Sequence, residues 1–334
     1  MSTTAMDQQV VDATVWDDAS SSDDTVLSLR SGFLKLTEVD SDVHFANHQD
    51  LWTPPGARGV FGGQTIAQAV HAAMRSVGPG YIVHSFHGYF LLAGDAGRNI
   101  LFHVDRIRDG RSFATRRVEA KQKNKVIFSA TMQFHVPEPS YGLEVADPMP
   151  PVPSWEGLKS DFQIMKEMLE DPTSAVPDGM RQLFLKRING PQRIERRQIP
   201  KEAADVLEPV TWYWTRSPLK LDDDPSTHKV CLAYLSDMGM ITAAYGPFGG
   251  WEQNRPNMVV SLDHSMWFHS DNFRADEWLL FETRCHRASG ARILSLCKVW
   301  SSSSKELVFS CTQEGLARHS ETKPLVRVVP DSKL

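Results

Sequence analysis

The stretch Phe61-Gly62-Gly63-Gln64 decides the fold, because it opens a pattern of three motifs that the chain repeats once. The first copy continues with Val83-His84-Ser85-Phe86-His87 and Phe128-Ser129-Ala130-Thr131. The second copy reads Leu235-Ser236-Asp237, Val260-Ser261-Leu262-Asp263-His264 and Phe309-Ser310-Cys311-Thr312. Matched residues are 173 to 181 positions apart, which is far longer than the period of a stacked repeat protein. Residues 60–134 and 233–314 therefore predict a duplicated domain.

The two copies differ at matched polar positions. The pairs are Gln64 and Asp237, His84 and Ser261, and Met132 and Gln313. A duplicated scaffold that keeps its apolar pattern and changes its polar residues indicates that one copy has specialised. Our hypothesis places the chemistry in the second half of the chain.

The bulk composition indicates a globular protein with two ordinary domains. The 334 residues are 41% hydrophobic, and the formal net charge of −5 argues against a nucleic-acid partner. The four cysteines show no metal-binding or redox spacing, so we expect reduced, mostly buried thiols. No apolar run approaches the roughly 18 residues of a membrane span.

The pattern of apolar residues and turn signals predicts an α+β fold with the same element order in both copies. In the first copy a single strand with a loop over 34–47 precedes a helix over 59–77, and strands over 81–92, 99–108, 112–122 and 126–135 follow it. In the second copy a strand at 210–214 and a helix over 228–245 precede strands over 258–269, 278–286, 292–300 and 307–316. This order predicts, in each copy, an antiparallel sheet wrapped around one long helix, with the two sheets joined edge to edge.

These elements divide the chain into five parts. We expect a disordered tail over 1–31, a first module over 32–137, a linker with a helical segment at 160–169 over 138–208, a second module over 209–320, and a C-terminal tail over 321–334. The charged stretch 188–202 of the linker is expected on the surface. The final residues Ser332-Lys333-Leu334 match a peroxisomal address that an import receptor reads.

Several familiar catalytic patterns are absent from the sequence. There is no Gly-x-Ser-x-Gly elbow, no P-loop and no His-Glu-x-x-His motif. On a strand, His84 and His87 face opposite sides, as do His264 and His269, so neither pair favours a metal site. We interpret these histidines as hydrogen-bonded structural residues. Neither a metal nor an organic cofactor is expected.

Four motifs together resemble the type II acyl-CoA thioesterases, which are double hotdog proteins of bacteria and peroxisomes. The motifs are Val60-Phe61-Gly62-Gly63-Gln64, Ser112-Phe113-Ala114-Thr115-Arg116-Arg117-Val118, Ser261-Leu262-Asp263-His264-Ser265-Met266-Trp267-Phe268-His269 and Gln313-Glu314-Gly315. The resemblance covers about residues 30–320. It implies hydrolysis of acyl-CoA and a catalytic set of Asp237, Ser261 and Gln313. From spacing alone, Asp237 is equally consistent with an ordinary capping or surface carboxylate.

The chain departs from the family pattern at a few loop positions. Ala93 stands where proline is usual, Ser270-Asp271-Asn272 replaces a shorter loop, and Cys285-His286-Arg287 is atypical. These departures concern substrate choice more than catalysis.

The chemistry of a thioesterase fits the implied residues. Asp237 can accept a proton from water, while Ser261 and Gln313 can hold the water or the thioester oxygen. We expect substrate contacts at Gly62, Gly63, Gln64 and Arg117, because the glycines at a helix start allow close approach to an oxyanion. Arg58 and Arg116 are further candidates for the phosphates of CoA, although at most one of Arg116 and Arg117 can face such a ligand.

Alternatives remain open. Asp263 competes with Asp237 as the base, because on a regular strand it points to the same side as Ser261. The same fold also supports an enoyl-CoA hydratase, which favours an Asp/His pair, or a protein that only binds acyl-CoA. For the reaction, our hypothesis is direct attack by water without a covalent acyl-enzyme. We also expect a homo-oligomer, because hotdog edges and faces commonly serve as interfaces.

Overall fold

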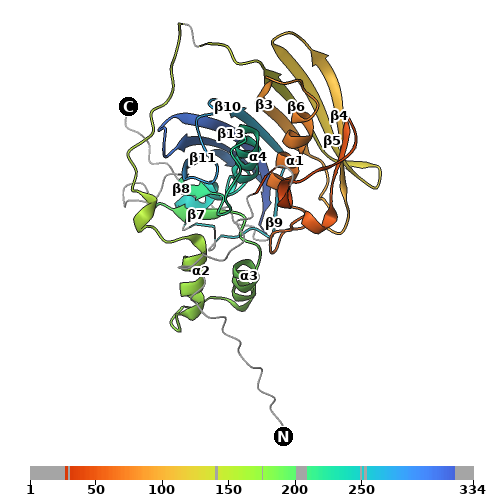
Figure 1. Ribbon diagram of the computed structural model, residues 1–334. Helices are drawn as coiled ribbons and strands as arrows, with labels where there is room; N and C mark the ends of the chain where they lie inside the picture. The colour runs from red at the N-terminus through yellow and green to blue at the C-terminus, as the bar shows by residue number, and fades with distance from the viewer. Residues whose placement is uncertain are drawn as a thin grey trace, which may run out of the picture.

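A computed structural model describes residues 27–28, 31–139, 142–174, 176–200, 209–248, 250–251 and 254–319. One curved sheet wraps two central helices, and a lobe of two further helices lies below it (Figure 1). The predicted address Ser332-Lys333-Leu334 lies outside the described residues. Leu27, which the prediction assigned to the N-terminal tail, is buried, and its backbone pairs with Lys220 and Asp222. The folded part of the chain therefore includes Leu27.

The first module has one long helix and six strands. Its elements are β1 (Thr37–Asp40), β2 (Val43–Ala46), α1 (Gly62–Met74), β3 (Ile82–Phe90), β4 (Ile100–Asp109), β5 (Phe113–Gln122) and β6 (Lys125–His135), with short 3-10 turns at Gly32–Leu34 and His48–Asp50. The helix and the last four strands match the predicted ranges to within a few residues at each end. The stretch expected to hold a single first strand is instead the hairpin of β1 and β2.

The second module repeats this order with a shorter helix. Its elements are β8 (Val210–Arg216), α4 (Pro225–Ser236), a 3-10 segment η4 (Thr242–Phe248), β9 (Met258–Ser261), β10 (Asp263–Phe268), β11 (Leu279–Ser289), β12 (Arg292–Ser301) and β13 (Leu307–Arg318). The predicted helix over 228–245 is wrong in its second half. Gly239 adopts a φ of +85°, which ends the right-handed helical path, and Pro247 lies inside the following 3-10 segment.

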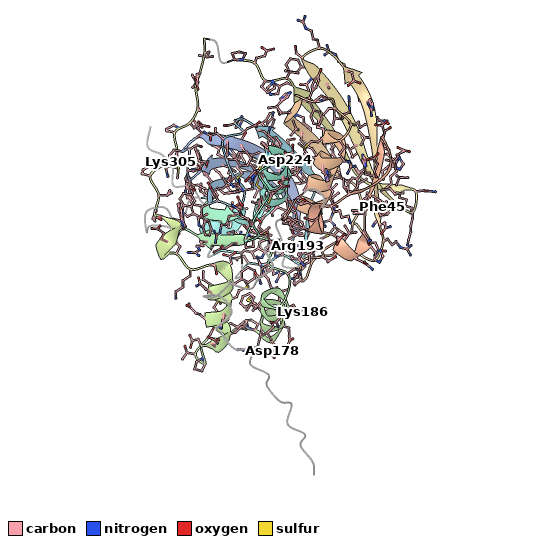
Figure 2. The ribbon with its side chains drawn as sticks, viewed as in Figure 1. Phe45, Asp178, Lys186, Arg193, Asp224 and Lys305 are labelled. Carbon is pink, nitrogen blue, oxygen red and sulfur yellow. The ribbon has the colours of Figure 1, made fainter. Side chains whose placement is uncertain are left out.

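The linker carries more structure than the sequence predicted. Helix α2 (Asp161–Glu170) is the expected helix, and a capping box between Ser160 and Gln163 fixes its start. Helix α3 (Asp178–Ile188) was not predicted, and Asp178 and Lys186 mark it in the lower lobe (Figure 2). Within the charged stretch expected only to lie on the surface, strand β7 (Glu195–Gln198) pairs with β8.

The two modules form one continuous sheet, as expected for two hotdog sheets joined edge to edge. The strand order is β1-β2-β4-β5-β6-β3-β10-β13-β12-β11-β8-β7, and β9 pairs with β13 beside this path. The joint is the antiparallel pair of β3 and β10. The double hotdog prediction is confirmed.

Both helices lie inside the curve of the sheet and contact each other (Figure 1). Residues 63–73 of α1 and 227–236 of α4 are all buried, because each helix has sheet on one side and the other helix on the other. Asp224, which is labelled in Figure 2, is exposed and caps the start of α4 by accepting the N–H of Ser226 at 2.9 Å. This arrangement brings the start of α1 next to the end of α4.

Candidate active site

The start of α1 and the end of α4 are joined by a hydrogen bond between the two halves of the chain. The backbone N–H of Gly63 donates to Oδ2 of Asp237 at 2.8 Å. The first N–H groups of a helix have no partner within the helix and carry partial positive charge, so they attract a carboxylate. Asp237 is the residue that directly follows α4, rather than a residue inside the helix as predicted.

The two glycines allow this close approach. A Cβ atom on Gly62 would lie 2.7 Å from Oδ2 of Asp237, and a Cβ atom on Gly63 would overlap with the carbonyl oxygen of Tyr234. Neither position has room for a side chain without movement of α4. The Gly-Gly pair therefore sets the distance between the helix start and the carboxylate.

Asp237 has the properties of a base. Burial raises the pKa of its carboxyl group from the usual range near 4 to about 7, while Gln313, the N–H of Gly63 and Ser261 act in the opposite direction and favour the ionised form. Its second oxygen, Oδ1, is buried and has no direct hydrogen-bond partner within the described part of the chain. A carboxylate with a pKa near neutrality and a free acceptor can take a proton from water.

The other two predicted catalytic residues contact each other on the sheet. Ser261 ends β9 and Gln313 lies in the middle of β13, where it is buried. The side-chain amide of Gln313 donates through Nε2 to Oγ of Ser261 at 2.8 Å. Since both residues also stabilise the ionised form of Asp237, the structure brings the three predicted residues together.

Asp263, the competing base, lies on the other face of the sheet. The prediction assumed one regular strand over 258–269, but β9 ends at Ser261 and β10 begins at Asp263, with Leu262 in the break. Across this break the alternation of faces is lost. Oδ1 of Asp263 accepts the backbone N–H of Glu314 at 3.1 Å. The geometry therefore favours Asp237 over Asp263.

The same break gives the site a histidine that the sequence did not assign to it. His264 is fully buried, and its Nδ1 lies 2.6 Å from Oε1 of Gln313. It is a hydrogen-bonded histidine, as interpreted, but its partner is a predicted catalytic residue. His264 lies three residues after Ser261, and this spacing brings both residues to one face only if the strand is irregular. The spacing is the sequence signal that could have identified His264.

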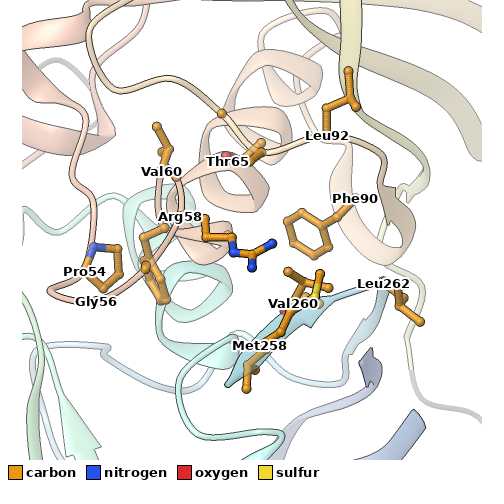
Figure 3. A pocket seen from close by; sticks show the side chains of 18 of the residues that line it. Pro54, Gly56, Arg58, Val60, Thr65, Phe90, Leu92, Met258, Val260 and Leu262 are labelled. Carbon is orange, nitrogen blue, oxygen red and sulfur yellow. The ribbon is translucent and has the colours of Figure 1, made fainter. Parts of the chain in front are cut away.

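A cavity of about 500 Å³ opens beside these residues (Figure 3). Gly62 and Ser261 line one part of it, and its walls are mostly apolar, with contributions from Phe90 and Val260. Two arginines, Arg58 and Arg255, also line the cavity. In the close view the side chain of Arg58 points into the cavity, toward the side of Phe90 (Figure 3). The cavity thus joins an apolar surface to two cationic groups.

Two of the predicted substrate-binding residues have other roles in the structure. Gln64 is fully buried, and its amide bonds to the backbone of Trp52, Phe33 and Asp50. Arg117 is half exposed on β5, where it pairs with Asp105 at 2.6 Å, and it does not line the cavity. Their predicted substrate contacts are corrected, because the amide of Gln64 already has its partners and the charge of Arg117 is paired elsewhere.

Arg116, the further candidate for CoA phosphates, is buried and bonds to Ser76 and Asp109.

Among the described residues no group of three or more His, Cys, Asp or Glu side chains could hold a metal ion. No helix in the described part of the chain is long and apolar enough to cross a membrane.

The fold and this site define an enzyme of the double hotdog class. Residues 49–135 match the family of acyl-CoA thioesterase N-terminal domains, and residues 167–317 match the corresponding C-terminal domains. The chain therefore belongs to the type II acyl-CoA thioesterase family, and it is a thioester hydrolase, as the sequence resemblance implied.

Named relatives agree with this assignment. The chain is 36% identical to acyl-coenzyme A thioesterase 8 of Rattus norvegicus over 89% of this chain and 90% of the relative. It is 25% identical to the peroxisomal acyl-coenzyme A thioester hydrolase 1 of Saccharomyces cerevisiae over 78% of this chain and 86% of the relative.

Solved structures show the same architecture. The crystal structure of an acyl-CoA thioesterase II from Mycobacterium marinum is 32% identical, with a TM-score of 0.68 over 87% of this chain and 98% of that chain. A hot dog fold protein of unknown function from Alicyclobacillus acidocaldarius has a TM-score of 0.62 at 20% identity, over 86% of this chain and 97% of that chain, which supports the fold alone.

Proposed function

We propose that this enzyme hydrolyses acyl-CoA to a free carboxylic acid and CoA by direct attack of water. The observation that carries the proposal is the carboxylate of Asp237. It has a raised pKa and a free oxygen, and it lies next to Gly62 and Ser261, which line an apolar cavity. Such a cavity suits the acyl group and the pantetheine arm of the substrate.

In the proposed reaction Asp237 accepts one proton from the attacking water as the new C–O bond forms at the thioester carbonyl. The tetrahedral intermediate then collapses, the C–S bond breaks, and the electron pair leaves with the CoA thiolate. Protonated Asp237 returns its proton to that thiolate. Ser261 and Gln313 are proposed to orient the water, because their polar groups lie together beside the carboxylate.

The developing oxyanion is proposed to bind at the start of α1. Gly62 is the first residue of this helix and lines the cavity, while the N–H of the next residue, Gly63, is already used by Asp237. Unpaired N–H groups and the positive end of the helix dipole favour negative charge at this place. Gly62 thus serves the oxyanion and Gly63 positions the base.

Arg58 and Arg255 are proposed to bind the phosphates of CoA. Both side chains line the cavity and are exposed, and no ion pair is formed by either within the described residues. An arginine without a carboxylate partner at the edge of an apolar cavity can bind a phosphate through two parallel hydrogen bonds. Arg58 was one of three candidates from the sequence, whereas Arg255 was not recognised.

The alternatives fit the geometry less well. A hydratase that relies on an Asp/His pair would need contact between Asp237 and a histidine, but His264 lies behind Gln313. A covalent acyl-Ser261 would need Oγ to act as the nucleophile, but Oγ already accepts a hydrogen bond from the amide of Gln313, which makes it a weaker nucleophile. Mass spectrometry of enzyme quenched during turnover tests this point, because an acylated Ser261 would contradict direct water attack.

The activity itself is tested by measuring CoA release from short, medium and long acyl-CoAs with a thiol reagent, together with detection of the free acid. We expect hydrolysis of at least one chain length. Hydrolysis in ¹⁸O-labelled water should place one heavy oxygen in the product acid. A folded protein that binds acyl-CoA and releases neither product would contradict the proposal. That result would favour the alternative of a protein that only binds acyl-CoA.

We further propose that the enzyme acts in the peroxisome, imported by a receptor that reads Ser332-Lys333-Leu334. The printed name of the yeast relative and this tripeptide support the proposal. A fluorescent fusion at the N-terminus should co-localise with a peroxisomal marker. Deletion of the tripeptide should disperse the signal, and an unchanged distribution would contradict the proposal.

Self-association is also proposed. Tyr89, Leu91 and Leu92 each expose more than half of their surface at the end of β3, and a group of exposed large apolar side chains is typical of an interaction surface. Light scattering of the purified protein should give the mass of at least a dimer. A monomer at micromolar concentration would contradict this proposal.

A further inference from the structure

His264 lies directly behind the predicted catalytic amide. Its Nδ1 is 2.6 Å from Oε1 of Gln313, and its Nε2 is 3.0 Å from Oγ of Ser236. Both ring nitrogens and both partner side chains are buried. Ser236 is the last residue of α4 and directly precedes Asp237, so the histidine connects the end of that helix to the amide on β13.

The carboxylate of Asp237 sets the direction of this amide. An ionised carboxylate only accepts hydrogen bonds, whereas an amide has a donor end and an acceptor end. The NH₂ end of Gln313 faces Ser261, and Gln313 stabilises the ionised form of Asp237. If the amide were turned end for end, its oxygen would face the carboxylate and oppose ionisation. The acceptor end must therefore point to His264.

This direction decides which nitrogen of His264 carries the hydrogen. Because Oε1 of Gln313 can only accept, Nδ1 must donate. Burial lowers the pKa of His264 to about 4, so the ring is neutral at neutral pH and has one hydrogen. Nε2 is then an acceptor, and the hydroxyl of Ser236 donates to it. The hydroxyl of Ser236 has only one hydrogen. Besides Nε2 of His264, the carbonyl oxygen of Ala233, 2.9 Å from Oγ of Ser236, can accept it.

We propose that His264 is a positioning residue, whose neutral Nδ1–H form holds the Gln313 amide with its NH₂ end toward Ser261 and Asp237. The proposal rests on the proposed function of the Asp237, Ser261 and Gln313 set. It adds that a second, buried hydrogen bond holds the amide from its other end, so that the donor end stays fixed toward the site. Without that bond the amide is held from one end only and loses its fixed position.

The first test compares two substitutions of His264 in the full chain, with a third substitution as a control. His264→Leu removes the donor, whereas the side-chain amide of His264→Asn can place a donor near the position of Nδ1. His71→Leu is the matched control, because His71 is also buried, has a pKa lowered to about 4, and donates through Nδ1 to the carbonyl of Leu34. It lies on α1 and bonds to no catalytic residue.

We expect His264→Leu to lower kcat by roughly ten- to a hundredfold with little change in KM, since a misplaced catalytic group affects the chemical step. His264→Asn should recover most of this loss, and His71→Leu should keep kcat within about twofold of wild type. A folded His264→Leu enzyme with wild-type kcat would overturn the proposal, and so would a His264→Asn enzyme that folds but is no more active than His264→Leu.

The second test uses the wild-type enzyme, so it does not depend on whether a variant folds. The ¹⁵N signals of His264 in the wild-type enzyme report which ring nitrogen carries hydrogen. The proposal expects a protonated Nδ1 and an unprotonated Nε2 at neutral pH, and the opposite tautomer would overturn it. The result is independent of activity. If Asp237→Asn abolishes hydrolysis while the histidine shows the opposite tautomer, this inference fails and the proposed function stands.

Discussion

The backbone N–H of Gly63 donates to Oδ2 of Asp237 across 2.8 Å, which joins the start of the first-module helix to the end of the second-module helix. The contact explains why the proposed active site needs both halves of the duplication. One half supplies a helix start with unpaired N–H groups, and the other supplies the carboxylate and the amide on the sheet. The two helices meet because one continuous sheet surrounds both.

The space at this contact predicts that neither glycine tolerates alanine. Gly63→Ala should destabilise the fold by about 1–3 kcal/mol, because the new methyl group overlaps with the carbonyl of Tyr234. Gly62→Ala should mainly reduce kcat, since its methyl group meets Oδ2 of Asp237. Urea unfolding and CoA release measure the two effects. The control is Gly78→Ala, where nothing lies within 4 Å of the added Cβ. Equal free energies of unfolding and equal kcat values for all three variants would contradict these expectations.

The pKa of Asp237 predicts the pH dependence of activity. The base must be ionised, and burial raises its pKa to about 7. The ratio kcat/KM should therefore rise with pH through about 7 and fall by about tenfold for each pH unit below that value. A pH profile with a soluble acyl-CoA measures this. Activity that stays constant down to pH values near the ordinary pKa of an aspartate would contradict a buried base.

The same group predicts a pH-dependent cost in stability. The folded pKa lies above the unfolded value, so this carboxyl favours folding at low pH, and its contribution is lost as pH rises from about 4 to about 7. Asp237→Asn has no such loss. Its stability relative to wild type should increase across this window, by on the order of a few kcal/mol. Urea unfolding at several pH values measures the difference in the free energy of unfolding between the variant and wild type. A difference that does not change with pH would show that burial does not raise the pKa of Asp237.

The two cavity arginines predict a substrate-dependent defect. Arg58→Ala and Arg255→Ala should each raise KM for acyl-CoA by roughly tenfold, because a charge-assisted hydrogen bond to phosphate contributes about 1.5 kcal/mol or more. Neither should affect hydrolysis of the matching acyl-N-acetylcysteamine thioester, which has no phosphate. Arg117→Ala, whose side chain pairs with Asp105, is the control. Equal losses on both thioesters would show that the arginines serve the structure.

The repeated motifs and the apolar alternation, which are local properties of the chain, predicted the duplication and most strands, whereas the resemblance to the family implied Asp237, Ser261 and Gln313. It missed features that depend on breaks in regularity. The helix that holds Asp237 ends one residue before it, and the strand that holds Ser261 breaks at Leu262. The strand break places His264 in the site and Asp263 outside it.

The proposed substrate contacts were harder to predict for a different reason. Gln64 stands beside the Gly-Gly motif, but the chain folds back so that Phe33 and Asp50 occupy its amide. Arg255 comes from a segment with no motif and reaches the cavity only through the tertiary fold. Pairwise sequence spacing contains no information on such contacts.

If Asp237 is the base of thioester hydrolysis, conservative variants of the two candidate carboxylates should differ in turnover. CoA release should be measured for wild type, Asp237→Asn and Asp263→Asn under the same conditions. We expect a loss of at least roughly a hundredfold in kcat for Asp237→Asn, the usual scale for a general base, and nearly wild-type activity for Asp263→Asn. A folded Asp237→Asn enzyme with normal turnover, or a comparable loss in Asp263→Asn alone, would contradict it.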